Sequence, residues 1–207
     1  MKHIYLIRHG QTTYNQQGVV QGSGIDSDLN EKGLLQAVAF FEVYKNIPFD
    51  TIYTSKLKRT VQSVQPFLNI GLKHEAHVGL NEISWGSKEG QAVLPHEEDP
   101  FFSKMLAEWR KGNTHISAFG GESPDEVATR QKPFLETLFS PEKAHENNVL
   151  ICMHGRAMRV LLCQLLNFPI SEMDTFEHGN LCLYHLVYTG SMVNILKHNE
   201  RSHLLGI

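Results

Sequence analysis

The chain has 207 residues, of which 41% are hydrophobic and 20% are charged, and its formal net charge is −3. This length and composition predict one globular domain, residues 1–207, with enough chain for a sizeable core. The slightly acidic balance and the lack of a long basic run argue against nucleic acid as a partner. No stretch is apolar over the ~18 residues of a membrane span, and no signal-peptide pattern appears, so we expect a cytoplasmic protein without a membrane partner.

The first predicted element is a strand at 2–8, which runs straight into Arg8, His9 and Gly10. In open α/β sheets, ligands bind beyond the carboxyl ends of the strands. Arg8 offers a planar cationic fork for an anion, and His9 can be a nucleophile, a base or a metal ligand. Gly10 allows a tight turn or a close approach to a ligand. Two solvated polar residues at a strand end would give the same pattern, so this segment alone leaves both readings open.

Two helices follow in the first half of the chain. The first is predicted at 30–44, with a buried face made of Leu34, Ala37, Val38 and Phe41. A strand at 50–54 precedes the second helix at 56–68, for which Ser55 is the expected N-cap. Arg59 falls in the first turn of that helix, where a cation is electrostatically misplaced unless an anion binds there. We therefore expect Arg59 to contact a ligand, with an exposed basic helix start as the alternative.

The middle of the chain supplies two carboxylates. After a short strand at 73–78, Glu82 opens a glycine-rich loop that also contains Glu89. Either side chain could serve as an acid or a base, and each on its own could equally be a surface residue. Residues 91–118 show little pattern, except that the aromatic spacing between 101 and 109 predicts a packed helix over the site.

The second half of the chain repeats the opening motif. A strand at 148–153 runs into His154 and Gly155, so two strands deliver a His-Gly turn to the same edge of the sheet. A helix with a capping box is predicted to begin after Ser123, and the tail between 181 and 197 reads as an antiparallel hairpin. The alternation of strands and helices predicts an α/β fold, a three-layer α/β/α sandwich with a mainly parallel central sheet.

Five motifs occur in a fixed order. They are the Leu-Ile-Arg-His-Gly-Gln-Thr-x-x-Asn opening, the Ser-x-Leu-x-Arg-Thr helix start, the Leu-x-Glu-x-x-x-Gly-x-x-Glu-Gly loop, the Gly-Gly-Glu-Ser turn at 120–123 and the Met-His-Gly strand end at 153–155. Together they resemble the histidine phosphatase superfamily, phosphoglycerate mutase branch, over residues 1 to about 190. The resemblance implies a phosphoglycerate mutase-like fold for the α/β/α sandwich.

The resemblance also implies a role for each motif. It implies that His9 becomes phosphorylated and that Glu82 donates and later accepts a proton. It further implies that the phosphoryl group is bound by Arg8, Arg59 and His154. The substrate would also be contacted by Asn15, Gln21, Gly155 and His178. This chemistry suits a phosphoryl group, because arginines donate in pairs to its oxygens, and His154 would add a third cation if it were protonated. No metal and no cofactor are expected.

We therefore predict a metal-independent phosphatase that hydrolyses small phosphomonoesters through a phosphohistidine on His9. A phosphoglycerate mutase, which returns the phosphoryl group to a reoriented product, is the alternative, and an inactive module that binds phosphorylated ligands is a remote one. The compact chain and the Ser-Lys-Leu-Lys-Arg helix start at 55–59 resemble the phosphatases more than the mutases. The expected partner is a small phosphorylated metabolite, and a homodimer is left open.

Overall fold

The computed structural model describes residues 1–93 and 98–207. Six strands form one sheet in the order β3-β2-β4-β1-β5-β6. The pairs β1–β4, β4–β2 and β2–β3 are parallel, whereas β5 runs antiparallel to β1 and β6 antiparallel to β5. The strands are β1 (Lys2–Arg8), β2 (Thr51–Thr54), β3 (His74–Ala76), β4 (Asn148–Met153), β5 (Leu183–Tyr188) and β6 (Val193–Glu200). The α-helices are α1 (Thr13–Gln17), α2 (Glu31–Tyr44), α3 (Lys58–Asn69), α4 (Pro100–Arg110), α5 (Pro124–Leu138) and α6 (Gly155–Leu166).

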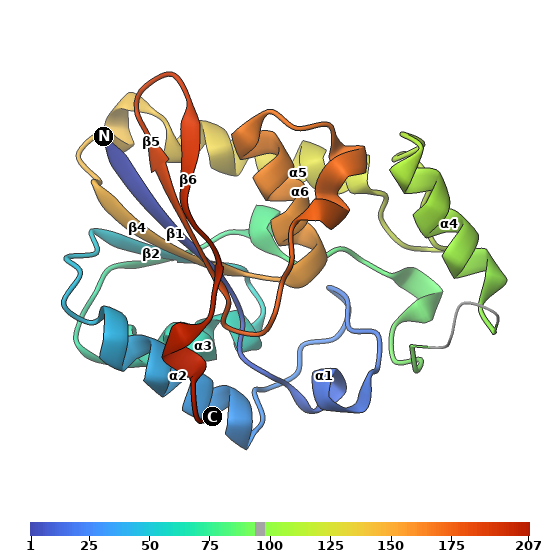
Figure 1. The fold of residues 1–207 in the computed structure, drawn as a ribbon, viewed down its shortest axis with the longest axis horizontal. Coiled ribbons are helices and arrows are strands. Elements are labelled where there is room, and N and C mark those ends of the chain that lie inside the picture. Colours follow the sequence, from blue (N-terminus) through green and yellow to red (C-terminus); the bar gives the residue numbers. More distant parts are fainter. Residues whose placement is uncertain (94–97) are drawn as a thin grey trace.

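The sheet separates two hydrophobic clusters, and side chains alternate between them along β1. Ile4 and Leu6 pack with residues of α5 and α6, whereas Tyr5 and Ile7 pack with residues of α2 and α3. Figure 1 shows α5 and α6 on one side of the sheet and α2 and α3 on the other. The mainly parallel α/β/α sandwich expected from the sequence is thus confirmed.

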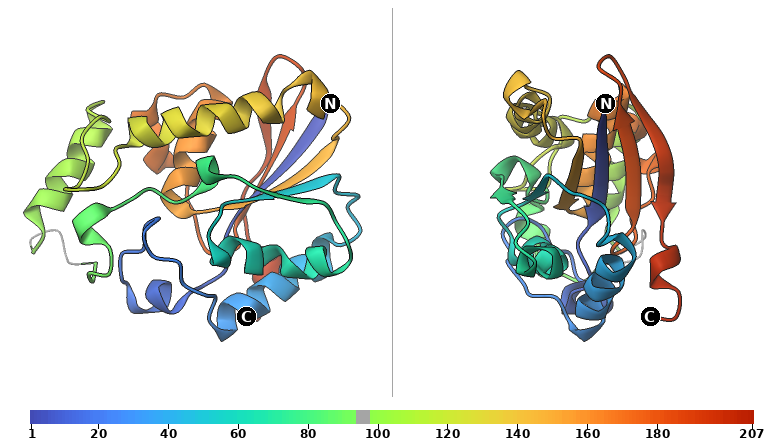
Figure 2. Two further views of the ribbon diagram at one scale, coloured as in Figure 1. Left: turned by 180° about the vertical axis from the view of Figure 1, so that it is seen from behind. Right: turned by 90° about the vertical axis from the view of Figure 1, so that its left-hand side faces the viewer.

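The carboxyl ends of β1, β2 and β4 lie at one edge of the sheet because these strands are parallel. Both α1 and α4 lie beyond this edge, and the view from behind in Figure 2 gives the same arrangement. The expected helix between 101 and 109 is α4, which Asp99 caps by accepting a hydrogen bond from the Phe102 N–H. Residues 94–97, part of the segment 91–118, lie outside the described residues.

The buried face of α2 differs from the prediction. Leu34 and Val38 are 49% and 51% exposed. Ala37 is buried and Phe41 packs against the core as predicted, and the helix also buries Phe40 and Tyr44. Apolar residues occur on every side of this helix, so the helical period alone did not single out one face. The assignment of Leu34 and Val38 to the core was wrong.

Ser55 is not the N-cap of α3. That helix begins at Lys58 after Leu57, and the Ser55 hydroxyl accepts a hydrogen bond from the Leu57 N–H at 3.1 Å. The capping box predicted at Ser123 is confirmed, because the Ser123 hydroxyl and the Glu126 carboxylate each accept from the other's backbone N–H. No helix in residues 1–93 or 98–207 is long and apolar enough to cross a membrane.

Candidate active site

A cavity of ≈ 230 Å³ opens at the carboxyl ends of the central strands. Six of the nine predicted site residues line it, namely Arg8, His9, Asn15, Gln21, Glu82 and His178. Of the other three, His154 lies behind this wall with its ring 5.1 Å from that of His9, Gly155 packs against the His178 ring, and Arg59 donates to His154. All nine predicted residues therefore gather around one small cavity.

His9 is held in one tautomer by the backbone. Its Nδ1 lies 2.7 Å from the Gly10 carbonyl oxygen, and because a carbonyl only accepts hydrogen bonds, Nδ1 must carry the proton. Burial, reinforced by the positive charges of Arg59 and Arg8, holds the pKa of His9 well below its ordinary value. The imidazole is therefore neutral, with a lone pair on Nε2.

Arg59 and His154 form a buried chain of hydrogen bonds. Arg59 Nε donates to His154 Nδ1 at 3.1 Å, so His154 Nε2 carries the proton and donates to Ser55 Oγ at 2.8 Å. Burial and the nearby Arg59 hold the pKa of His154 well below its ordinary value. His154 is therefore not a third cation in this geometry, in which its neutral ring orients Arg59. Sequence reasoning missed Ser55 in this role because it assigned the hydroxyl to helix capping.

Arg8 carries an unused donor at the cavity. Its Nη1 donates to the His178 carbonyl at 2.7 Å, while its buried Nε has no hydrogen-bond partner in the part of the chain that the structure describes. A Cβ on Gly155 would lie 2.2 Å from the His178 ring and 3.4 Å from Arg8 Nε, so only glycine permits this packing. A buried guanidinium N–H without an acceptor is costly, and the positive charge of Arg8 on the cavity wall favours an anion in the cavity.

Glu82 lies at the N-terminus of α6. Its Oε1 accepts from the Ile83 and Ala157 N–H groups at 2.9 Å each, and its Oε2 accepts from the Arg156 N–H at 3.2 Å. Glu89, the other carboxylate of the loop, does not line the cavity. Its carboxylate packs directly against Gly22, since a Cβ on Gly22 would lie only 2.1 Å from Glu89 Oε1. Of the two alternatives left open by the sequence, only Glu82 reaches the cavity.

Comparison with known proteins decides the family. The family model described as histidine phosphatase superfamily (branch 1) matches residues 4–201. The chain belongs to this superfamily. A putative phosphoserine phosphatase 2 of Hydrogenobacter thermophilus is 27% identical to it over 207 residues, covering 98% of each chain.

Further relatives widen the range of activities. A 2,3-bisphosphoglycerate-dependent phosphoglycerate mutase of Cytophaga hutchinsonii is 29% identical over 168 residues, covering 78% of this chain and 76% of the mutase. The structure of a mycobacterial glucosyl-3-phosphoglycerate phosphatase complexed with VO3 has a TM-score of 0.84 and 27% identity, covering 97% of this chain and 100% of that one. The match to the family model and the phosphatase relatives identify the chain as a phosphoric monoester hydrolase of the histidine phosphatase type.

Asn15 and Gln21 are fixed at the cavity wall of this histidine phosphatase. Asn15 Oδ1 accepts from the Asn180 amide at 3.1 Å, and the same amide nitrogen donates to the His9 carbonyl at 3.1 Å. Gln21 accepts from the Thr12 hydroxyl at 2.9 Å and donates to the Ser27 hydroxyl. Both side chains are thus held by neighbours on the same wall as His9.

Sequence reasoning missed part of the cavity wall, namely Val19, Val20, Trp85, Val93, Phe102 and Arg156. Arg156 carried a signal, because it directly follows His154 and Gly155 in the chain. Phe102 was assigned to helix packing, and it both packs against the core and lines the cavity. Among the described residues, no group of three or more His, Cys, Asp or Glu side chains is placed to hold a metal ion.

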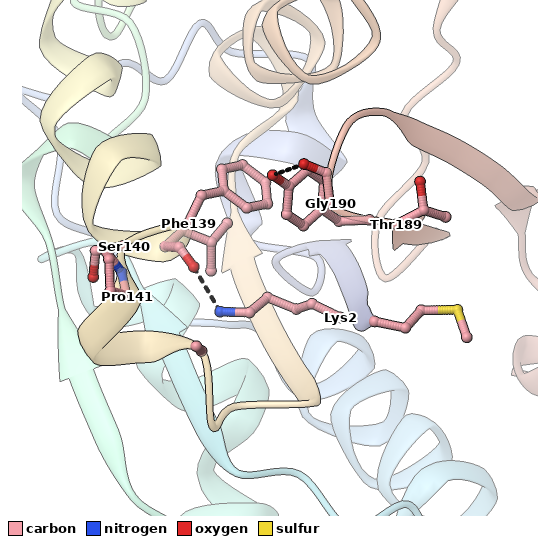
Figure 3. A pocket seen from close by; sticks show the side chains of 10 residues that line it. Lys2, Phe139, Ser140, Pro141, Thr189 and Gly190 are labelled. Carbon is pink, nitrogen blue, oxygen red and sulfur yellow. Dashed lines mark hydrogen bonds between the residues drawn. The ribbon is translucent and has the colours of Figure 1, made fainter.

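A second cavity, of ≈ 270 Å³, lies near the N-terminus and is shown in Figure 3. Lys2 is its cation, and its amino group already donates to the Leu138 carbonyl at 2.6 Å and to the Lys143 carbonyl at 3.0 Å. Because the Lys2 amino group already donates to two carbonyls, this cavity has weaker donors for a phosphate than the cavity beside His9, which Arg8 lines.

Proposed function

We propose that this enzyme hydrolyses small phosphomonoesters in two steps through a phosphohistidine on His9. In the first step, Nε2 of neutral His9 attacks phosphorus, the ester P–O bond breaks, and protonated Glu82 gives its proton to the leaving oxygen. In the second step, water attacks the phosphohistidine, Glu82 takes a proton from that water, and phosphate leaves as the P–N bond breaks. The observation that carries the proposal is the hydrogen bond from His9 Nδ1 to Gly10, because it directs the lone pair of the ring to Nε2.

In this scheme the arginines stabilise the negative charge of the phosphoryl group. Arg8 and Arg59 bind the phosphoryl oxygens, whose negative charge spreads during transfer. His154 acts by orienting Arg59 Nε, and Asn15, Gln21, Gly155 and His178 shape the contact with the substrate. The cavity volume of ≈ 230 Å³ favours a small alcohol portion, since pockets for larger ligands span about 300–1,000 Å³.

A panel of phosphomonoesters, assayed without added metal and with or without a bisphosphoglycerate primer, tests this proposal. A phosphatase releases inorganic phosphate at the same rate whether or not the primer is present. A mutase excludes water from the phosphohistidine and returns the phosphoryl group to its product. Isomerisation of phosphoglycerate that depends on the primer would contradict the proposal and favour the mutase activity.

Arg59→Lys should lower kcat/KM by about 30- to 1,000-fold, a loss of ~2–4 kcal/mol of transition-state stabilisation. Lysine keeps the charge but has one nitrogen in place of the three with which Arg59 donates to His154 Nδ1, the Ile25 carbonyl and the Gly22 carbonyl, so it loses the fixed planar fork. Steady-state kinetics on p-nitrophenyl phosphate would measure the loss. Arg110→Lys is the matched control, because the Arg110 side chain is 59% exposed and donates to Asp174, whereas Arg59 is buried and donates to His154. An Arg59→Lys rate within a few-fold of the parent would remove Arg59 from the phosphate clamp.

A further inference from the structure

Arg156 presents unused hydrogen-bond donors at the cavity wall. Its side chain is 13% exposed, and its Nη1 donates to Asp174 Oδ1 at 2.6 Å. In residues 1–93 and 98–207, this is the one hydrogen bond that the Arg156 side chain makes. The guanidinium also lies 5.8 Å from the Trp85 ring and 5.4 Å from the Trp109 ring, which fixes its plane. A guanidinium held in this way, largely shielded from water, is a preorganised site for a planar anion.

The surroundings of Arg156 carry an excess of positive charge. Asp174 accepts from Arg156, from Arg159 Nη1 at 2.8 Å and from Arg110 Nε at 3.0 Å, so three cations share one carboxylate. Two positive charges are left without a partner in this cluster. In the proposed mechanism Arg8 and Arg59 already match the charge of a bound phosphoryl dianion, so Arg156 is available to a second anionic group of the substrate.

We propose that Arg156 binds a carboxylate on the alcohol portion of the substrate and thereby selects phosphorylated hydroxy acids over neutral phosphomonoesters. This inference rests on the proposed phosphatase function. A carboxylate matches the planar fork of a guanidinium with two parallel hydrogen bonds, and the small cavity brings the alcohol portion close to the wall that contains Arg156. Asp174 is a positioning residue in this account, because it reaches the substrate only through Arg156.

The direct test compares 3-phosphoglycerate with glycerol 3-phosphate, which differ only by a carboxylate in place of a hydroxymethyl group. The unmodified enzyme should show a kcat/KM at least about 10-fold higher for 3-phosphoglycerate, the scale of one hydrogen bond to a charged group. Equal values would overturn the inference. This comparison needs no variant, so it stands even if substitutions at Arg156 impair folding.

Arg156→Gln should reduce the ratio of the two kcat/KM values by about 10- to 100-fold. The backbone N–H of residue 156 still donates to Glu82, so this ratio reports the lost side chain and not a displaced Glu82. Arg110→Gln removes another cation from the same carboxylate without touching the cavity, and should change the ratio by less than about 3-fold. An unchanged ratio in Arg156→Gln would overturn the inference.

The failure of this inference can be told apart from the failure of the phosphatase proposal. An enzyme that hydrolyses both esters and p-nitrophenyl phosphate equally well keeps the phosphatase function and loses only the carboxylate selectivity. An enzyme that releases phosphate from none of the three esters overturns both proposals.

Discussion

His9→Ala is expected to abolish turnover, lowering kcat by about four orders of magnitude or more, because it removes the proposed nucleophile. Labelling of the protein by a radioactive phosphomonoester should disappear with it. The bound phosphate of the parent should be labile in acid and stable in base. Single-turnover assays with rapid quenching would measure both the rate and the label.

The fold should survive this substitution. The Gly10 N–H keeps its hydrogen bond to the Ser63 hydroxyl at 2.8 Å, and the β1–β4 pairing does not involve the imidazole. Circular dichroism and thermal unfolding of His9→Ala therefore serve as controls. A folded His9→Ala protein with full activity would contradict the mechanism.

Glu82→Gln should slow the hydrolysis of alkyl phosphates by about 100-fold or more, the usual contribution of a general acid. The hydrolysis of an aryl ester such as p-nitrophenyl phosphate should slow much less, because its phenolate leaves without a proton. Glutamine can keep the hydrogen bonds from Ile83 and Ala157 through its amide oxygen, so a gross loss of structure is not expected. Steady-state kinetics on both types of ester would measure this selectivity.

Glu89→Gln is the matched control in the same loop. Glu89 accepts a hydrogen bond from the Trp85 N–H at 3.0 Å and does not line the cavity. Any loss of activity in Glu89→Gln should therefore be the same for both types of ester. An equal loss on both types of ester for Glu82→Gln, or a selective loss in Glu89→Gln instead, would show that the acid is wrongly assigned.

The sheet and the cluster of site residues could be predicted from local sequence patterns. A buried strand that ends in Arg8 and His9, and another that ends in His154, must place these residues at one edge if the strands are parallel. The confirmed capping box at Ser123 is equally local, because both of its hydrogen bonds lie within one helical turn.

Contacts between distant segments could not be predicted in this way. The bond of Arg59 to His154 joins residues 95 positions apart, and it decides that the histidine ring is neutral. Nothing in the sequence identifies the Gly10 carbonyl as the acceptor for His9 Nδ1. The buried face of α2 depended on tertiary packing for the same reason, since Leu34 and Ala37 are both apolar and only one of them faces the sheet.

The position of the phosphate on the His9 ring tests the central claim most directly. Enzyme quenched in base during turnover can be analysed by ³¹P nuclear magnetic resonance, which separates the two phosphohistidine isomers. Because Nδ1 keeps its proton and donates a hydrogen bond to the Gly10 carbonyl, the account predicts phosphate on Nε2 of His9. Phosphate on Nδ1, on another residue, or on no residue during active turnover would contradict it.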